Sequence, residues 1–270
     1  MIESSGMPVL VVVGVGGMGR AIARRLGSGK RVLLADFNEA GLNAVAAELR
    51  GDGFSVETRA VDVSDAASVR ALAATAAEMG PIMQLAHTAG LSPVQASAPA
   101  IIAVDLVGVA MTLDAFGEVI APGGAGVVIA SMAGQLAQIT PEQDRALEET
   151  PTDRLGSLPF LSGITPTDAY SFAKRANQTR MHAASVTWGH RGARVNTVSP
   201  GIISTPMGQQ ELAGPAGDGM RAMIEGSGTG RIGTPDDIAA AVAFLLGPDA
   251  TFITGTDLLV DGGTVASMRA

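Results

Sequence analysis

Tyr170 and Lys174 are the two residues whose types and spacing most directly suggest chemistry. On a helix, residues four positions apart share a face, so the phenol and the ammonium point the same way. A free tyrosine has a pKa of about 10 and is a poor base at neutral pH. A neighbouring ammonium favours the phenolate and lowers that pKa. The pair therefore predicts proton transfer by Tyr170; the alternative is a surface pair, because this spacing is frequent by chance.

A glycine-rich turn near the N-terminus has the spacing of a phosphate-binding loop. It directly follows the apolar run Val9–Val13 and precedes a segment of helical character, Arg20–Leu26. A side chain here would block the tight turn and the approach of backbone N–H groups to a pyrophosphate, which then faces the helix N-terminus. The turn supplies five predicted cofactor-binding residues: Gly14, Gly16, Gly17, Met18 and Gly19.

Asp36 ends the second apolar run, Arg31–Ala35, and lies 17 residues after Gly19. A carboxylate at this position accepts hydrogen bonds from ribose hydroxyls and repels a 2′-phosphate. The sequence therefore predicts NAD rather than NADP as cofactor. The alternative for Asp36 is an ordinary acidic residue at a helix N-terminus.

Short apolar runs alternate with longer amphipathic segments along the whole chain. Runs that are apolar on both faces are typical of a parallel sheet covered by helices, and successive βαβ units give a doubly wound, Rossmann-type α/β fold. We expect a single domain with seven strands, in the runs Val9–Val13, Arg31–Ala35, Ser55–Val61, Ile82–Ala86, Gly126–Ala130, Val195–Val198 and Leu258–Val260. Helices are expected at Glu39–Leu49, Ala66–Glu78 and Ala100–Ile120, with capped helix starts at Thr140 and Thr234.

Composition narrows the classes of function. A net charge of −8 argues against nucleic acid. The chain has no cysteine, and its three histidines are too scattered for a zinc site, so no metal is expected. The N-terminal apolar run is too short for a signal peptide, and no run approaches the ~20 apolar residues of a membrane span. A cytoplasmic location and no membrane partner are the expectation.

Together with four further stretches, these motifs resemble the short-chain dehydrogenase/reductase family over nearly the full length of the chain. The stretches are Asp62-Val63, residues 129–134 around Ser131, residues 194–201 followed by Thr205-Pro206, and Asp261-Gly262-Gly263. The resemblance implies reversible hydride transfer between NAD(H) and a secondary alcohol or ketone. It implies that Tyr170 passes the proton, Lys174 lowers the pKa of the phenol and holds the ribose, and Ser131 binds the substrate oxygen. The end of a strand, where Ser131 lies, is also where open α/β sheets bind ligands.

The resemblance extends the set of predicted cofactor-binding residues, which comprises Asp62, Val63, Ala89, Gly90, Tyr170, Lys174, Pro200, Gly201, Ile203 and Thr205 in addition to the turn and Asp36.

Three local departures from the family pattern stand out. The glycine turn is one residue shorter than the usual one. Asp105 occupies the place of an asparagine that organises a water relay to the lysine; it either accepts from a water or is a helix-surface aspartate. His87 stands where the family often has asparagine, and a structural role is favoured over a catalytic one.

The fourth departure is an insertion at about residues 134–167, which separates Ser131 from Tyr170 by 39 positions. It resembles the bacterial 3α-hydroxysteroid dehydrogenase/carbonyl reductase branch, would lie near the cleft mouth, and could obstruct a helix face used in family tetramers. The segment 204–230 contains three methionines and is interpreted as a substrate lid for a bulky alicyclic or steroid-like substrate, or as a generic surface loop. A homodimer or homotetramer is expected.

Two other functions remain open. An enoyl-thioester reductase would share the fold, but its tyrosine and lysine are typically farther apart. A non-catalytic nucleotide-sensing protein would keep the glycine turn without needing Ser131, Tyr170 and Lys174 together.

Overall fold

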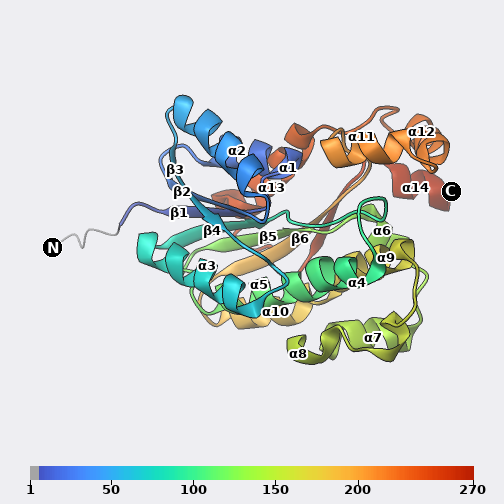
Figure 1. The fold of residues 1–270 in the computed structure, drawn as a ribbon, viewed down its shortest axis with the longest axis horizontal. Coiled ribbons are helices and arrows are strands. Elements are labelled where there is room, and N and C mark those ends of the chain that lie inside the picture. Colours follow the sequence, from blue (N-terminus) through green and yellow to red (C-terminus); the bar gives the residue numbers. More distant parts are fainter. Residues whose placement is uncertain (1–5) are drawn as a thin grey trace.

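A seven-stranded parallel sheet forms the centre of the protein in the computed structural model, which describes residues 6–270 (Figure 1). The strand order is β3-β2-β1-β4-β5-β6-β7. The strands are β1 (Val9–Val13), β2 (Arg31–Asp36), β3 (Ser55–Ala60), β4 (Ile82–His87), β5 (Ala125–Ile129), β6 (Arg194–Pro200) and β7 (Asp257–Val260). The predicted Rossmann-type sheet is confirmed, and each strand lies within one or two residues of its predicted run.

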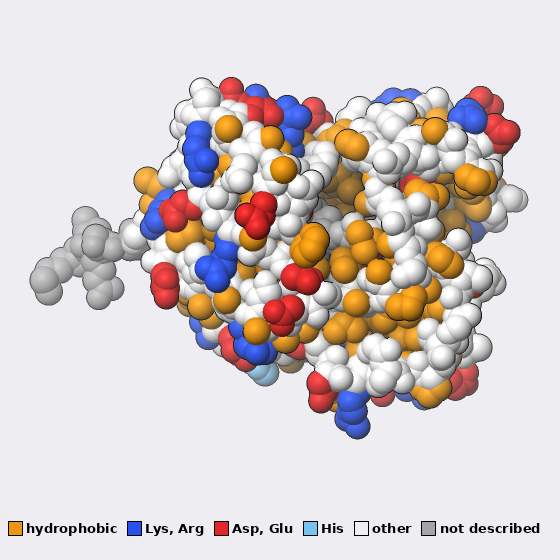
Figure 2. Space-filling model, in the orientation of Figure 1, with side chains coloured by type: hydrophobic (Ala, Val, Ile, Leu, Met, Phe, Trp, Pro, Cys, Tyr) orange, Lys and Arg blue, Asp and Glu red, His pale blue; other side chains and the backbone are white. Residues whose placement is uncertain are grey.

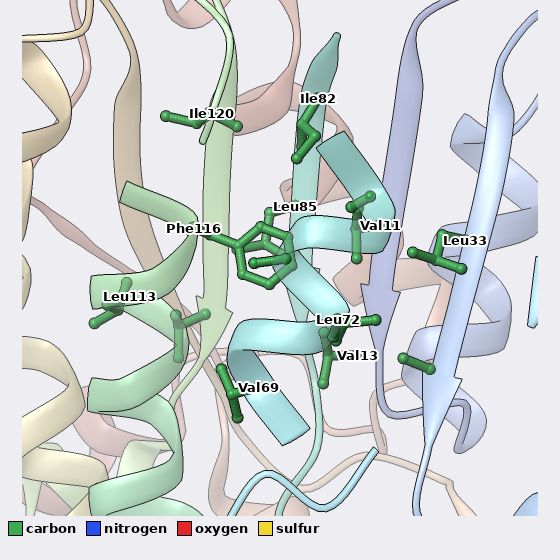
Figure 3. Packing of buried hydrophobic residues seen from close by; sticks show 14 of the residues in the cluster. Val11, Val13, Leu33, Val69, Leu72, Ile82, Leu85, Leu113, Phe116 and Ile120 are labelled. Carbon is green, nitrogen blue, oxygen red and sulfur yellow. The ribbon is translucent and has the colours of Figure 1, made fainter. Parts of the chain in front are cut away.

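Helices cover both faces of the sheet (Figure 1). One face carries α1 (Gly17–Leu26), α2 (Glu39–Gly51) and α13 (Pro235–Leu246), and the other carries α3 (Ala66–Met79), α5 (Val109–Gly117), α9 (Pro166–Thr179) and α10 (Met181–Gly189). Because both faces are covered, β1 and β5 are buried along their whole length. Figure 3 shows how Leu72 and Phe116, from α3 and α5, pack onto Val11 and Leu85 of the sheet.

The strand order places the ends of β1 and β4 at the middle of the sheet. The chain runs outward from β1 to β2 and β3 on one side, and outward from β4 on the other. Connections that leave in opposite directions open a crevice at the carboxyl ends of these two strands, which is where such sheets bind ligands. The backbone N–H of Thr88 donates to Val13 O at 2.7 Å, so the loops after β1 and β4 lie against each other.

The predicted helix over Ala100–Ile120 is a composite. It begins as α4 (Ala98–Ile101), continues as a π-helical segment, η1 (Ile102–Gly108), and ends as α5. By length and composition, Ala98–Gly117 is apolar enough to cross a membrane, contrary to the expectation from the sequence. Most of its residues (61%) are buried within the fold, so packing in the core accounts for its apolar character.

Two segments stand out from this frame. Residues 204–230 form α11 (Pro206–Ala213) and α12 (Gly217–Gly226), and the inserted residues form α7 (Pro141–Glu149), α8 (Thr152–Leu155) and the turn η2 (Pro159–Leu161). In Figure 1, α7 and α8 lie on the side of α9 away from α11 and α12, so these two helices do not cover the cleft mouth where the insertion was expected.

The capping boxes at Thr140 and Thr234 are both present. The remaining short helices are α6 (Met132–Gln135), η3 (Pro248–Ala250) and α14 (Thr264–Arg269).

Candidate active site

The glycine turn is shaped by close approaches that no other residue tolerates. Gly14 has φ +90°, and a Cβ there would lie 2.5 Å from Ala89 N. A Cβ on Gly19 would collide with Gly14 O. Gly16 is the N-cap of α1, and a Cβ on it would meet nothing within 4 Å. The turn therefore presents open backbone at the positive end of a helix, which suits a pyrophosphate.

A cavity of about 560 Å³ opens beside this turn. Ten of the predicted cofactor-binding residues line it: Gly14, Gly16, Gly17, Met18, Asp36, Asp62, Val63, Ala89, Gly90 and Thr205. Residues outside the predicted cofactor-binding set complete the lining: Phe37, Val61, Ser64, Thr88, Leu91, Gln95, Val104, Pro206 and Met207. The glycine cradle and the cavity fit a dinucleotide.

Three of the other predicted cofactor-binding residues lie elsewhere. Pro200 is the buried last residue of β6. Gly201 and Ile203 line a neighbouring cavity of about 210 Å³ together with Asp261. The motif at residues 194–205 therefore predicted a segment that reaches the cavity beside the glycine turn, but not which of its residues line that cavity.

Asp36 is oriented by the backbone around it. One carboxylate oxygen accepts from the N–H of Val15, in the glycine turn, at 2.7 Å, and the other accepts from the N–H of Asn38 at 2.8 Å. Asn38, not Asp36, caps α2. The alternative of a helix-terminal acid is therefore wrong: Asp36 ends β2 and lines the cavity.

Tyr170, Lys174 and Ser131 come together at the end of β5. The Lys174 Nζ lies 5.3 Å from the centroid of the Tyr170 ring and donates to Ile129 O at 3.4 Å. Ser131 follows β5 as the N-cap of α6, and a hydrogen bond between its side chain and the phenol lowers the pKa of Tyr170. The three side chains thus form one cluster of a hydroxyl, a phenol and an ammonium.

Burial dominates the ionisation of the phenol. It raises the pKa of Tyr170 above its ordinary value, and this outweighs the lowering caused by Lys174 and Ser131. Asp105 and Glu211 add to the rise because negative charge disfavours a phenolate. The lowering by Lys174 that the spacing predicted is present, but it is smaller than the opposing effect of burial.

Asp105 lies behind this cluster and not on a helix surface. Its side chain has no exposed area, and one oxygen lies 3.0 Å from Lys174 Nζ while the other accepts from Leu91 N at 2.8 Å. His87, at the end of β4, is also fully buried. Burial and the Lys174 charge lower the pKa of His87 to about 3, so its imidazole stays neutral, in agreement with a structural role.

The lid segment faces the cluster from the opposite side of a hollow. Figure 2 shows this hollow between α11–α12 and the body, with many hydrophobic side chains along it. Gln210 of α11 accepts from Gln95 Nε2 at 2.9 Å, which ties the lid to the loop after β4. Glu211 on the same helix is half-buried, and burial raises the pKa of its carboxyl group. Residues 204–230 are predicted from the sequence as a lid or a surface loop, and Glu211 is not among the predicted site residues.

Comparison with known families covers most of the chain. Residues 8–141 match the family model described as short chain dehydrogenase. Residues 155–265 match a model described as enoyl-(acyl carrier protein) reductase.

Several characterised proteins are similar over nearly their full length. A protein described as short-chain dehydrogenase/reductase bsc3, from Alternaria brassicicola, is 40% identical across 95% of both chains. D-threitol dehydrogenase from Mycolicibacterium smegmatis is 34% identical across 96% of this chain and 92% of its own. Among solved structures, a 3-alpha-hydroxysteroid dehydrogenase from Pseudomonas sp., complexed with NADH, has a TM-score of 0.79 at 29% identity, covering 97% of this chain and 98% of its own.

Proposed function

This chain belongs to the short-chain dehydrogenase/reductase family, and we propose that it transfers hydride reversibly between NAD(H) and a secondary alcohol or the corresponding ketone. The cluster of Ser131, Tyr170 and Lys174 beside the dinucleotide-sized cavity is the observation that carries this proposal. The nicotinamide supplies the hydride chemistry when it is bound.

The protein's own contribution is proton transfer and orientation. In alcohol oxidation the Tyr170 phenolate accepts the hydroxyl proton, and in ketone reduction the phenol returns it to the new alkoxide oxygen. Ser131 holds the substrate oxygen next to the phenol. Lys174 favours the phenolate by its charge, which opposes the effect of burial on the pKa of Tyr170.

NAD is the proposed cofactor because of Asp36. Its carboxylate lies in the cavity next to the glycine turn, and each oxygen keeps a lone pair for a ribose hydroxyl. A 2′-phosphate at this position would meet the negative charge and lose binding energy.

The substrate class follows from the hollow under the lid. Met207, on the lid helix α11, lines the cavity, and methionine adapts its shape to bulky apolar groups. A bulky alicyclic or steroid-like secondary alcohol is the proposed substrate, as the similarity to a 3-alpha-hydroxysteroid dehydrogenase also suggests. We further propose a cytoplasmic homodimer or homotetramer, by the general rule of closed symmetry.

Enoyl-thioester reduction is the second candidate, because residues 155–265 match a model described by that activity. The four-residue spacing of Tyr170 and Lys174 favours the first candidate.

Absorbance at 340 nm tests the proposal. We expect NADH formation with a panel of cyclic secondary alcohols and none with saturated acyl thioesters, and NADH consumption with the matching ketones but not with enoyl thioesters. Tyr170→Phe should abolish turnover yet leave the Kd for NADH within about twofold, since the ring keeps its shape; Lys174→Ala should impair both. Turnover of enoyl thioesters, or retained activity in Tyr170→Phe, would refute the proposed reaction.

A further inference from the structure

We propose that Asp105 is a positioning residue, whose buried carboxylate holds the Lys174 ammonium and reduces the positive charge that acts on Tyr170. The kinetic consequence of this inference rests on the proposed function. The effect of Asp105 on the ionisation of the Tyr170 phenol can be measured without a substrate.

The geometry of the ion pair is the first support. The Asp105 oxygen lies 3.0 Å from Lys174 Nζ, and the two side chains are 0% and 5% exposed. Solvent screening at such a site is weak, so each charge acts strongly on its neighbours. A carboxylate that contacts the ammonium directly cancels part of the field that would otherwise favour the phenolate.

Three structural features orient Asp105 toward Lys174. The residue lies in the π-helical segment η1, between α4 and α5, and such segments occur frequently at functional sites. Gly90 leaves room for the pair: a Cβ at this position would lie 2.9 Å from the Asp105 carboxylate and 3.2 Å from Lys174 Nζ. The second carboxylate oxygen is held by Leu91 N, so the side chain has one orientation.

The other polar groups around the phenol do not replace this effect. Ser131, at the end of β5, is uncharged, and His87, at the end of β4, stays neutral because its pKa is lowered to about 3. Glu211 approaches from the lid helix α11 and also disfavours the phenolate. On α9 itself, Lys174 is the one group near Tyr170 that favours the phenolate by charge, and Asp105 is the group that pairs with it.

A neutral amide at position 105 should therefore make the phenol more acidic. In Asp105→Asn one acceptor oxygen remains, for either Leu91 N or the Lys174 ammonium, while the negative charge is lost. We expect the midpoint of Tyr170 ionisation to fall by about one pH unit, the order of magnitude for a unit charge several Å away at an effective dielectric constant of about 20. At a fixed pH below the midpoint, this is about a tenfold larger fraction of phenolate.

The chain contains one tyrosine, so phenolate absorbance near 295 nm reports Tyr170 alone. The titration is done on the full-length protein between pH 6 and 12, because burial raises the pKa of Tyr170 above its ordinary value of about 10. Circular dichroism verifies the fold at each pH. Asp114→Asn is the matched control: it removes the same charge nine residues later in the same helical stretch, about 13 Å along its axis. Asp105→Ser provides a second neutral variant if the amide does not fold.

The expected result is a lower midpoint in Asp105→Asn and no shift in Asp114→Asn. If the proposed reaction is correct, the acid limb of kcat/KM for alcohol oxidation shifts by the same amount. A midpoint in Asp105→Asn that equals or exceeds that of the unmodified protein, or no titration of Asp105→Asn below pH 12, would overturn the inference. A shifted absorbance titration without any dehydrogenase activity would instead refute the proposed function and leave the role of Asp105 intact.

Discussion

At the scale of single residues, Asp36 illustrates how the backbone prepares a side chain for selectivity. Two backbone N–H groups, from Val15 and Asn38, hold its carboxylate at the edge of the cavity. These two hydrogen bonds give the carboxylate one orientation. A negative charge with a defined position is what discriminates a ribose hydroxyl from a 2′-phosphate.

We therefore predict that NADH binds at least about tenfold more tightly than NADPH, a difference of about 1.4 kcal/mol. Asp36→Ala should narrow that ratio by weakening NADH binding and relieving the repulsion of the phosphate. Fluorescence titration with both cofactors measures the ratio, and Glu39→Ala, at an exposed acidic residue of α2, serves as the control. Equal affinities in the unmodified protein would contradict this prediction.

His87 makes a prediction about stability and pH. Its pKa is about 3 in the folded protein, against about 6.5 when unfolded. As the pH falls, His87 binds a proton in the unfolded chain before it does so in the folded protein. The contribution of neutral His87 to the free energy of unfolding is therefore complete above about pH 6.5 and is lost toward pH 3. Between pH 7 and pH 5 the loss from this one residue is about 2 kcal/mol.

Urea unfolding at the two pH values measures that loss. The decrease in the free energy of unfolding from pH 7 to pH 5 should be about 2 kcal/mol smaller in His87→Asn than in the unmodified protein. His182 and His190 are exposed and are present in both proteins, so their contribution cancels. Identical decreases would show that His87 does not couple folding to pH.

Residue spacing predicted Tyr170, Lys174, Ser131 and the glycine turn, because these motifs act over a few positions of one helix, turn or strand end. Spacing left Asp105 undecided between a residue that accepts a hydrogen bond from a relay water and a helix-surface aspartate. That choice depends on which helix lies against the π-helical segment, a contact between residues about 70 positions apart that local pattern does not contain.

At the scale of elements, apolar runs predicted β1 and β5 well, because these strands are buried along their whole length and contain no polar residue. The π-helical segment η1 was not predicted, because its residues other than Asp105 are as apolar as those of an ordinary buried helix. Residues 204–230 are predicted to form a lid or a surface loop, yet they contain α11 and α12. Thr205 is the N-cap of α11 and Pro206 is its first residue, a combination that is typical of a helix start.

The insertion is attached to the body mainly through α9. Arg175 makes a two-point ion pair with Asp144 of α7, at 2.6 and 2.9 Å. Arg180, just after α9, donates to the carbonyl oxygens at the end of α7, at Leu147, Glu148 and Thr150. These contacts satisfy carbonyl groups that have no partner within the helix, so the insertion forms an integral layer over α9.

At the scale of the whole molecule, this layer bears on assembly. Family members commonly pack the helix that carries the tyrosine and lysine against its copy in a neighbour. Here the apolar face of α9 packs against the insertion instead, with Leu147, Leu155 and Leu161 buried against Phe172 and its neighbours. A homo-oligomer of this chain should therefore use another surface.

Replacing most of residues 134–167 by a tight turn tests this arrangement. The deletion would expose the apolar face around Phe172 and Ala173, and exposed patches of that kind favour association. We expect a higher oligomeric state by light scattering, while the sheet still folds and NADH still binds, because the glycine turn and Asp36 lie on other elements. Arg175→Ala in the full-length chain is the milder control, since it removes the link to Asp144 but keeps the cover. An unchanged mass together with an unchanged KM for a substrate found in the alcohol panel would show that the insertion determines neither assembly nor substrate binding.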